Sequence, residues 1–320
     1  MTHPKRQILI SVVTPCYNEE LNVEKCAREV RRVMSKSLGK YDYEHIFIDN
    51  ASEDNTVSTL KNLAKDDNRI KIIVNSRNVG PFRSMWHGLK NTRGDLVIPM
   101  VPADLQDPPD VIPEMIQEWE KGALIVYGIR ASRLENFFMR SIRNFYYRAI
   151  KKLSDAEIPL NSGEFLLADR KIVDSIISID DEYPYIRGLF AQTGAKSAKV
   201  EYVWLKRFRG TSKNTFLSLI DQGLNGFIST SKVPTRFIML LGFMLSIIAI
   251  FSAFIMLVLF IINPVRPALG IPTLVVTVLF LGGAQLFFVG VVGEYVLSIH
   301  NQVRKRPSFF EIERVNFEKD

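Results

Sequence analysis

A carboxylate and an amide stand two residues apart at the end of an apolar segment that is typical of a strand, Leu96–Met100. They are Asp104 and Gln106, and their oxygens can face one cation. Mg²⁺ prefers oxygen ligands and is commonly shared with substrate phosphates. The pair therefore predicts a metal–nucleotide site. Asp104 and Asp107 could instead cap the following helix; because two prolines follow Asp107, we assign that residue to capping and Asp104 to the metal.

Three further polar clusters follow three other expected strands. They are Tyr17-Asn18-Glu19, Asp49-Asn50-Ala51-Ser52 and Asn75-Ser76-Arg77-Asn78. Ligands of parallel α/β sheets bind beyond the carboxyl ends of the strands. Polar side chains at four strand ends therefore predict one shared site.

The apolar periodicity alternates between strand and helix over the first 127 residues. The expected strands are 8–15, 45–49, 70–74, 96–100 and 124–127, and the expected helices are 19–36, 54–64, 80–90 and 112–121. This alternation predicts an α/β fold with a mostly parallel sheet and flanking helices.

The end of the chain has a different composition. Phe237–Ile262 has no charged residue, and Ile271–Ile299 is interrupted only by Gln285 and Glu294. Each run exceeds the roughly 20 residues that cross a bilayer. A buried core helix would explain one such run, but two runs joined by a short loop predict a transmembrane hairpin, with helices at about 237–262 and 271–297.

Basic residues flank this hairpin on its outer ends and set its expected orientation. Lys232 and Arg236 precede it and Arg304–Arg306 follow it, whereas the loop has only Arg266. We expect a cytoplasmic catalytic domain (1–210), an interfacial helix (211–235), two spans (236–300) and a cytoplasmic tail (301–320) at the cell inner membrane. A basic, aromatic helix over Leu134–Leu153 either lies on the membrane surface or packs on the domain.

The net charge of +7 favours anionic partners such as membrane lipids, and nucleic acid is not expected. No leader-like apolar segment precedes the first strand, and the two cysteines suit a reducing compartment. Glycines in the second span permit close helix packing, so a homo-oligomer is expected.

Several motifs, in order, resemble the large inverting, nucleotide-sugar-dependent glycosyltransferase family. They are Val13–Glu20, Asp49–Thr56, Asp104–Pro109, Tyr127–Arg130, Arg207–Lys213 and Gly293–Tyr295. With the hairpin, they look like the polyprenyl-phosphate branch, which includes dolichyl-phosphate mannose synthase and the bactoprenol glucosyltransferases. The resemblance implies a GT-A (Rossmann-like) fold.

The resemblance also implies roles for individual residues. The nucleotide pocket would contain Pro15, Tyr17, Glu19, Asp49, Asn50, Asn78 and Arg83. Phosphates would be bound by Arg130, Arg207, Arg209, Ser212 and Lys213. Asp104 and Gln106 would hold Mg²⁺ or Mn²⁺, and Glu164 would orient the sugar or the acceptor as a second catalytic residue. Two alternatives stay open: Glu19 as a first-turn helix acid, and the basic motif as a contact for lipid headgroups.

Four positions depart from the family pattern. Pro102 replaces the first acid of the metal motif, Asn50 and Ala51 replace an acid and a glycine, and Glu164 replaces an aspartate. The implied activity is transfer of one sugar, glucose from UDP-glucose, to a polyprenyl phosphate such as undecaprenyl phosphate. The departures also motivate a second hypothesis, a catalytically impaired nucleotide-sugar-binding membrane protein. A processive polysaccharide synthase is disfavoured because no Gln-x-x-Arg-Trp motif is present.

Overall fold

The computed structural model describes residues 7–132, 159, 161–179, 184–207, 270–303 and 309–317, with single positions between 242 and 262. The expected helices 134–153 and 211–235 lie outside these residues. The described chain divides into two units, which are treated separately below: residues 1–226 with 306–320, and residues 227–305.

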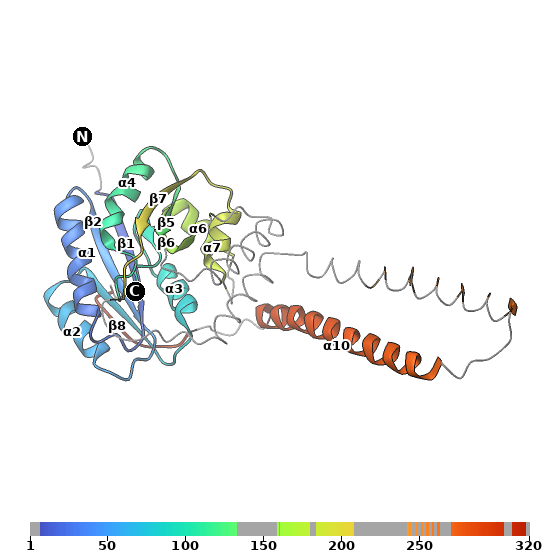
Figure 1. Cartoon of the computed structure of the whole chain (residues 1–320). Helices are drawn as coiled ribbons and strands as arrows, with labels where there is room; N and C mark the ends of the chain where they lie inside the picture. The colour runs from blue at the N-terminus through green and yellow to red at the C-terminus, as the bar shows by residue number, and fades with distance from the viewer. Residues whose placement is uncertain are drawn as a thin grey trace. The chain divides into compact units, whose positions relative to one another are not determined.

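The first unit is built around one sheet of eight strands (Figure 1). The strands are β1 (Leu9–Cys16), β2 (Asp42–Asp49), β3 (Ile70–Asn75), β4 (Leu96–Ile98), β5 (Ile125–Ser132), β6 (Ser162–Asp169), β7 (Ser197–Val203) and β8 (Glu311–Val315). Their order across the sheet is β7-β5-β6-β4-β1-β2-β3-β8. The central strands β4, β1, β2 and β3 are mutually parallel, as the alternating pattern predicted.

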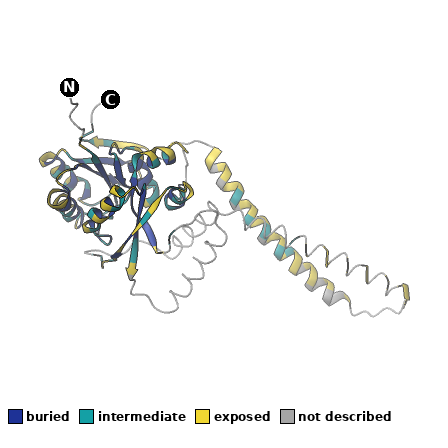
Figure 2. Ribbon diagram, turned by 90° about the horizontal axis from the view of Figure 1, so that it is seen from above, coloured by how far each residue is buried: buried dark blue, intermediate teal, exposed yellow. Residues whose placement is uncertain are grey.

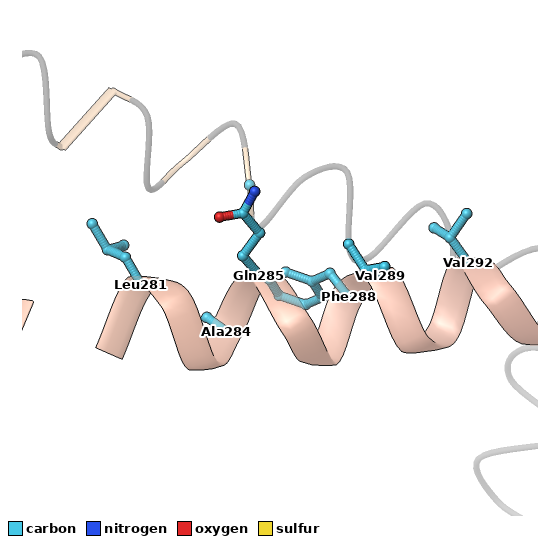
Figure 3. A pocket seen from close by; sticks show the side chains of 7 residues that line it. Leu281, Ala284, Gln285, Phe288, Val289 and Val292 are labelled. Atoms are coloured by element: carbon cyan, nitrogen blue, oxygen red, sulfur yellow. The ribbon is translucent and has the colours of Figure 1, made fainter. Parts of the chain in front are cut away.

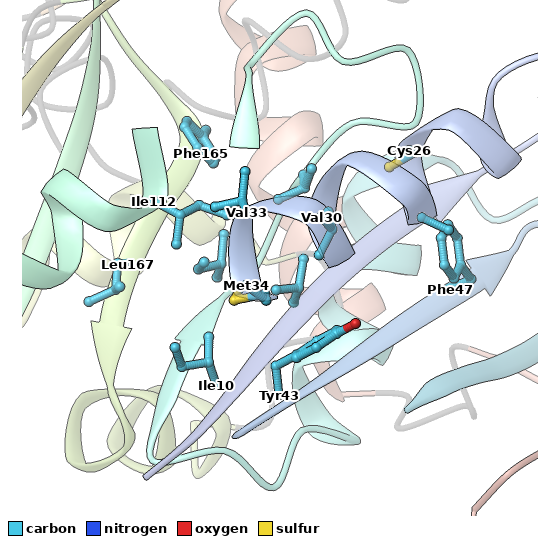
Figure 4. Close-up of a cluster of buried hydrophobic side chains, with 14 of the residues drawn as sticks. Ile10, Cys26, Val30, Val33, Met34, Tyr43, Phe47, Ile112, Phe165 and Leu167 are labelled. Carbon is cyan, nitrogen blue, oxygen red and sulfur yellow. The ribbon is translucent and has the colours of Figure 1, made fainter. Parts of the chain in front are cut away.

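Helices cover both faces of this sheet. They are α1 (Val23–Ser37), α2 (Thr56–Asp66), α3 (Pro81–Lys90), η1 (Pro109–Val111), α4 (Ile112–Glu120), α6 (Arg170–Ile177) and α7 (Ile186–Gln192). The larger core lies under α1, α2 and α4 (Figure 4). Val23, Val30 and Val33 recur at helical spacing and bury one face of α1 against the strands. The smaller core lies under α3, α6 and α7.

Strands β6, β7 and β8 do not follow the parallel βαβ pattern, and the sequence did not predict them. β6 runs antiparallel to both β4 and β5, and β7 pairs in parallel with β5. β8 comes from the C-terminal tail and pairs antiparallel with β3 at the edge of the sheet. The buried strands and the exposed outer helix faces are distinguished in Figure 2.

The second unit contains the long helix α10 (Gly270–Val303). It is the one helix in the described part of the chain that is long and apolar enough to cross a membrane, within the window Phe280–Leu297, and none of that window is buried. Of the expected hairpin, therefore, one helix is described; residues 237–262 lie mostly outside the described positions. An apolar groove beside α10 is lined by Gly242, Leu281, Gln285, Phe288 and Val292, among others (Figure 3).

Candidate functional site

The loops after β1, β2 and β4 leave the same edge of the sheet through sharp turns. Each turn has a non-glycine residue with left-handed backbone: Asn18 (φ 51°), Ala51 (φ 61°) and Leu105 (φ 57°). Such conformations are uncommon and concentrate at functional sites, where surrounding contacts hold them. The predicted strand-end clusters are therefore brought to one edge.

The first two of these loops are bound to each other by side-chain hydrogen bonds. The backbone N–H of Asn18 donates to Ser52 Oγ at 2.8 Å, and Glu53 N–H donates back to Asn18 Oδ1 at 2.8 Å. Glu19 N–H donates to Thr56 Oγ1 at 2.8 Å. Because these contacts satisfy backbone N–H groups of both loops from within the chain, they fix the two loops relative to each other.

Asp49 is buried at the end of β2 and retains an open acceptor. Its Oδ2 accepts from Ser52 N–H at 2.9 Å, while the buried Oδ1 has no hydrogen-bond partner among the described residues. Burial raises the pKa of this carboxyl above its usual value. A buried oxygen without a partner is costly, so Asp49 is suited to accept an N–H group from a ligand.

Asn50, next to Asp49, is fixed by the loop after β3. Its Nδ2 donates to Asn78 Oδ1 at 2.7 Å, and its Oδ1 accepts from Val79 N–H at 2.9 Å. The structure thus brings together Asn50 and Asn78 as predicted. Arg83 lies in the first turn of α3, and Pro15 and Tyr17 lie at the end of β1 and just beyond it.

Asp104 and Glu19 share one cationic side chain. Arg207 Nη2 hydrogen-bonds Glu19 Oε1, and Arg207 Nε lies 3.6 Å from Asp104 Oδ2. The three side chains are 11–20% exposed. Burial raises the pKa of Asp104, Arg207 opposes that effect and the nearby Glu19 reinforces it. The two carboxylates attract a divalent cation, and the Arg207 guanidinium between them attracts a phosphate.

These residues fit a divalent ion of the kind that binds nucleotides. Mg²⁺ is usually held by one or two carboxylates, with phosphate and water oxygens completing its shell. Asp104 and Glu19 supply two carboxylates, and Gln106, half-buried in the same loop, supplies an amide. No group of three or more acidic, histidine or cysteine ligands occurs within the described residues.

Asp107 does not cap the next helix, and that prediction was wrong. Residue Pro108 occupies the N-cap of η1, and no side chain caps it. The Asp107 carboxylate instead accepts two hydrogen bonds from Arg130, from Nε at 3.1 Å and from Nη2 at 2.9 Å, and one from Tyr202 Oη at 2.5 Å. A buried charge is stable only when it is paired, and Arg130 satisfies this need more completely than a helix end would.

Gly163 makes room for this pair, because a Cβ there would lie 3.0 Å from Arg130 Nη2. Arg130 was predicted to bind phosphate, and in this structure its guanidinium is hydrogen-bonded to Asp107. Its predicted phosphate contact stays a prediction.

Glu164 lies at the start of β6, on the site edge of the sheet. Strand alternation puts it on the face opposite Phe165, whereas Tyr202 packs edge-on against Phe165. Its carboxylate has no ion pair with a described residue, and its catalytic role stays a prediction. Arg209, Ser212 and Lys213 lie outside the described residues.

Sequence reasoning missed Tyr202 and Trp204 of the β7 region and His87 of α3. Tyr202 contacts Asp107, and Trp204 lies under Arg130, with the guanidinium carbon 5.2 Å from the ring centroid. His87 hydrogen-bonds Asn75. Tyr202 and Trp204 reach the site through the pairing of β7 with β5, and His87 reaches it from helix α3; the sequence contains no short motif for these long-range contacts.

Comparison with known proteins shows the family of the chain. The model of "Glycosyl transferase family 2" matches residues 11–177. "Uncharacterized glycosyltransferase YkcC" of Bacillus subtilis is 32% identical over 95% of this chain and 93% of its own length. The "SfII prophage-derived bactoprenol glucosyl transferase" of Shigella flexneri is 34% identical, over 94% of this chain and 96% of its own.

A solved mannosyltransferase from Pyrobaculum calidifontis, in complex with GDP-Man and Mn²⁺, has a TM-score of 0.44 and 17% identity, over 62% of this chain and 56% of its own. At that level of similarity two proteins need not share ligands. The family match covers more than half of the chain, including the loops of Asp49 and Asp104, and the curated relatives match nearly all of it. The chain is a glycosyltransferase and belongs to glycosyl transferase family 2.

Proposed function

We propose that this membrane-bound enzyme transfers a single glucose from UDP-glucose to a polyprenyl phosphate such as undecaprenyl phosphate, with inversion at the anomeric carbon. One observation carries the proposal: at one sheet edge, the open acceptor of Asp49 lies in the same set of loops as the Glu19–Arg207–Asp104 cluster. The first suits a nucleotide base and the second suits a diphosphate. The name of the Shigella relative, a bactoprenol glucosyl transferase, supports the sugar and the lipid.

The chain's own residues would bind and orient the two reactants. Asp49 would accept the imide N–H of uracil, and Arg207 would move from Glu19 to the donor phosphates. The acceptor is already an anion, so its phosphate oxygen can attack the anomeric carbon without a general base. The bond from that carbon to the diphosphate breaks, and its electron pair leaves with the nucleoside diphosphate. Mg²⁺ or Mn²⁺ bound at Asp104 and Gln106 would neutralise charge on the departing diphosphate.

The membrane arrangement is supported by two features. The window Phe280–Leu297 of α10 is apolar and unburied, which suits contact with lipid. β8 follows α10 in the chain and pairs with β3 of the catalytic sheet, so both strands must lie on one side of any membrane. An even number of crossings between β7 and β8 is then required. A hairpin of two transmembrane helices meets this requirement. The basic residues that flank it support a cytoplasmic domain and tail.

The test is a transfer assay with the full-length chain in detergent or nanodiscs. Undecaprenyl phosphate is incubated with UDP-glucose, other UDP-sugars or GDP-mannose, with Mg²⁺, Mn²⁺ or EDTA, and the lipid product is identified by mass spectrometry. We expect undecaprenyl-phosphate glucose, lost with EDTA and in Asp104→Asn. Asp110→Asn is the matched control, because Asp110 is an exposed acid of the same segment that pairs with Arg32. Absence of lipid-linked sugar with every donor would refute the proposal, and nucleotide binding without turnover would favour a binding protein.

A further inference from the structure

The C-terminal strand β8 docks beside the loop that holds the candidate donor pocket. Its Glu311 is in register with Asn75, the last residue of β3, where the pairing has a bulge. Ser76 N–H donates to the Phe310 carbonyl at 2.7 Å. Asn316 Nδ2 donates to the carbonyls of Ala64 and Ile70 at 2.8 and 2.9 Å. The tail is therefore an integral part of the sheet edge.

His87 connects this strand to the interior. Its Nε2 lies 2.7 Å from Glu311 Oε1 and its Nδ1 lies 3.0 Å from Asn75 Oδ1. The ring stacks on Phe309, with centroids 4.1 Å apart and planes 3° apart. The His87 side chain is 4% exposed. Contacts therefore fix both ring nitrogens and one face of the ring. Two of these three contacts, those with Glu311 and Phe309, come from the C-terminal tail.

The connection continues from Asn75 into the donor pocket. Asn75 Nδ2 lies 3.5 Å from Asn50 Oδ1, which also accepts from Val79 N–H at 2.9 Å. Asn50 in turn donates to Asn78, and it directly follows Asp49. Asn75 therefore adds a third, longer contact to an Asn50 amide that Asn78 and Val79 already hold. The Asn75 amide itself lies between His87 Nδ1 at 3.0 Å and Ser84 Oγ at 3.5 Å.

We infer that Glu311 and His87 are positioning residues for the nucleotide donor, so that the strand after the membrane helix completes the donor pocket. The inference rests on the proposed function, since it assumes that a nucleotide binds near Asp49 and Asn50. Glu311 Oε1 and Asn75 Oδ1 both only accept hydrogen bonds, so both contacts form together when both ring nitrogens of His87 carry a proton, and the Glu311 carboxylate pairs with the resulting charge. Loss of that carboxylate removes one of the contacts that hold the ring, and through Asn75 it weakens one of the contacts of Asn50.

The test measures UDP binding by calorimetry to the full-length chain, together with donor KM and kcat. Glu311→Ala and His87→Phe, which keeps a ring against Phe309, should each weaken UDP binding about fivefold, the value of one net hydrogen bond, and raise KM with little change in kcat. The double variant should bind no more weakly than either single variant, because both act through one path. Glu311→Gln should restore part of the affinity.

Glu313→Ala is the matched control. Glu313 lies on the same strand and pairs with Lys61 at 2.6 Å, with 41% of its side chain exposed. The Glu313→Ala variant should bind UDP as the wild type does. If both substitutions weaken only the docking of β8, the two variants should show the same change in melting temperature. Equal UDP affinity in the Glu311 and Glu313 variants, or additive losses in the double variant, would overturn the inference. A wild-type chain that bound no UDP would instead refute the proposed donor itself.

Discussion

Arg130 donates two hydrogen bonds to the Asp107 carboxylate inside the domain, from Nε at 3.1 Å and from Nη2 at 2.9 Å. The side chains are 15% and 6% exposed. This pair joins β5 to the loop that carries Asp104, and Tyr202 Oη adds a bond from β7. Leu205 N–H also donates to the Gln106 carbonyl at 2.9 Å. The pair therefore fixes the loop from which the candidate metal ligands project.

Asp107→Ala is expected to destabilise the domain by about 3 kcal/mol, because it leaves the Arg130 charge buried without its partner. Urea unfolding followed by tryptophan fluorescence measures this, since all three tryptophans lie in the first unit. The double variant Asp107→Leu/Arg130→Met removes both charges and should recover much of the stability. If it also recovers transfer activity, Arg130 only positions the loop; if activity stays lost, Arg130 contacts phosphate as well.

Arg207→Gln is expected to change metal affinity and turnover in opposite directions. Removing the cation between Glu19 and Asp104 should tighten Mn²⁺ binding about tenfold in the absence of nucleotide, because the positive charge of Arg207 no longer repels the ion or neutralises the two carboxylates. Transfer should fall, because the donor phosphates lose an arginine contact. Paramagnetic resonance of free Mn²⁺ gives the affinity. Lys206→Gln, an exposed neighbour, is the control, and weaker Mn²⁺ binding in Arg207→Gln would contradict the arrangement.

Ala51→Gly is expected to stabilise the domain by about 1 kcal/mol. Ala51 has φ 61°, a conformation that costs an alanine side chain roughly 1–2 kcal/mol and costs glycine little. The gain corresponds to a melting temperature rise of about 2–4 °C in a domain of this size. Ala27→Gly, within helix α1, should show the opposite change. A lower melting temperature for Ala51→Gly would show that the loop does not hold this backbone in solution.

His45 is expected to make the domain sensitive to acid. Burial lowers the pKa of His45 from 6.5 to about 3, and its Nδ1 has no partner among the described residues. Between these two values the unfolded chain binds a proton that the folded chain excludes. Stability is therefore present above pH 6.5 and is lost as the pH falls towards 3, by up to about 1.4 kcal/mol per pH unit. Urea unfolding of His45→Gln should show a slope smaller by that amount, and an unchanged slope would contradict the assignment.

The central part of the fold could be predicted from the sequence because each of its helices and strands is marked by residues that are close together in the chain. Residues of α1 recur at helical spacing, β2 contains the short apolar run Ile46–Ile48, and strand-end polar residues such as Asp49 and Asp104 mark the carboxyl edge. These features follow from burying one face of each helix and both faces of a parallel sheet. The site residues that lie directly after parallel strands were therefore predicted from the sequence.

The tertiary structure decided the partners of those residues. Asp107 has both a capping signature and a buried environment, and only the approach of Arg130 and Tyr202, 23 and 95 residues away in sequence, determines that it forms an ion pair. Glu311 is 224 residues from His87, and no local pattern links the C-terminal strand to helix α3. By itself the sequence determined the α/β core, the chemistry at the strand ends and the apolar C-terminal segments. Long-range packing decided which charges neutralise each other, because a buried charge needs a partner wherever in the chain that partner lies.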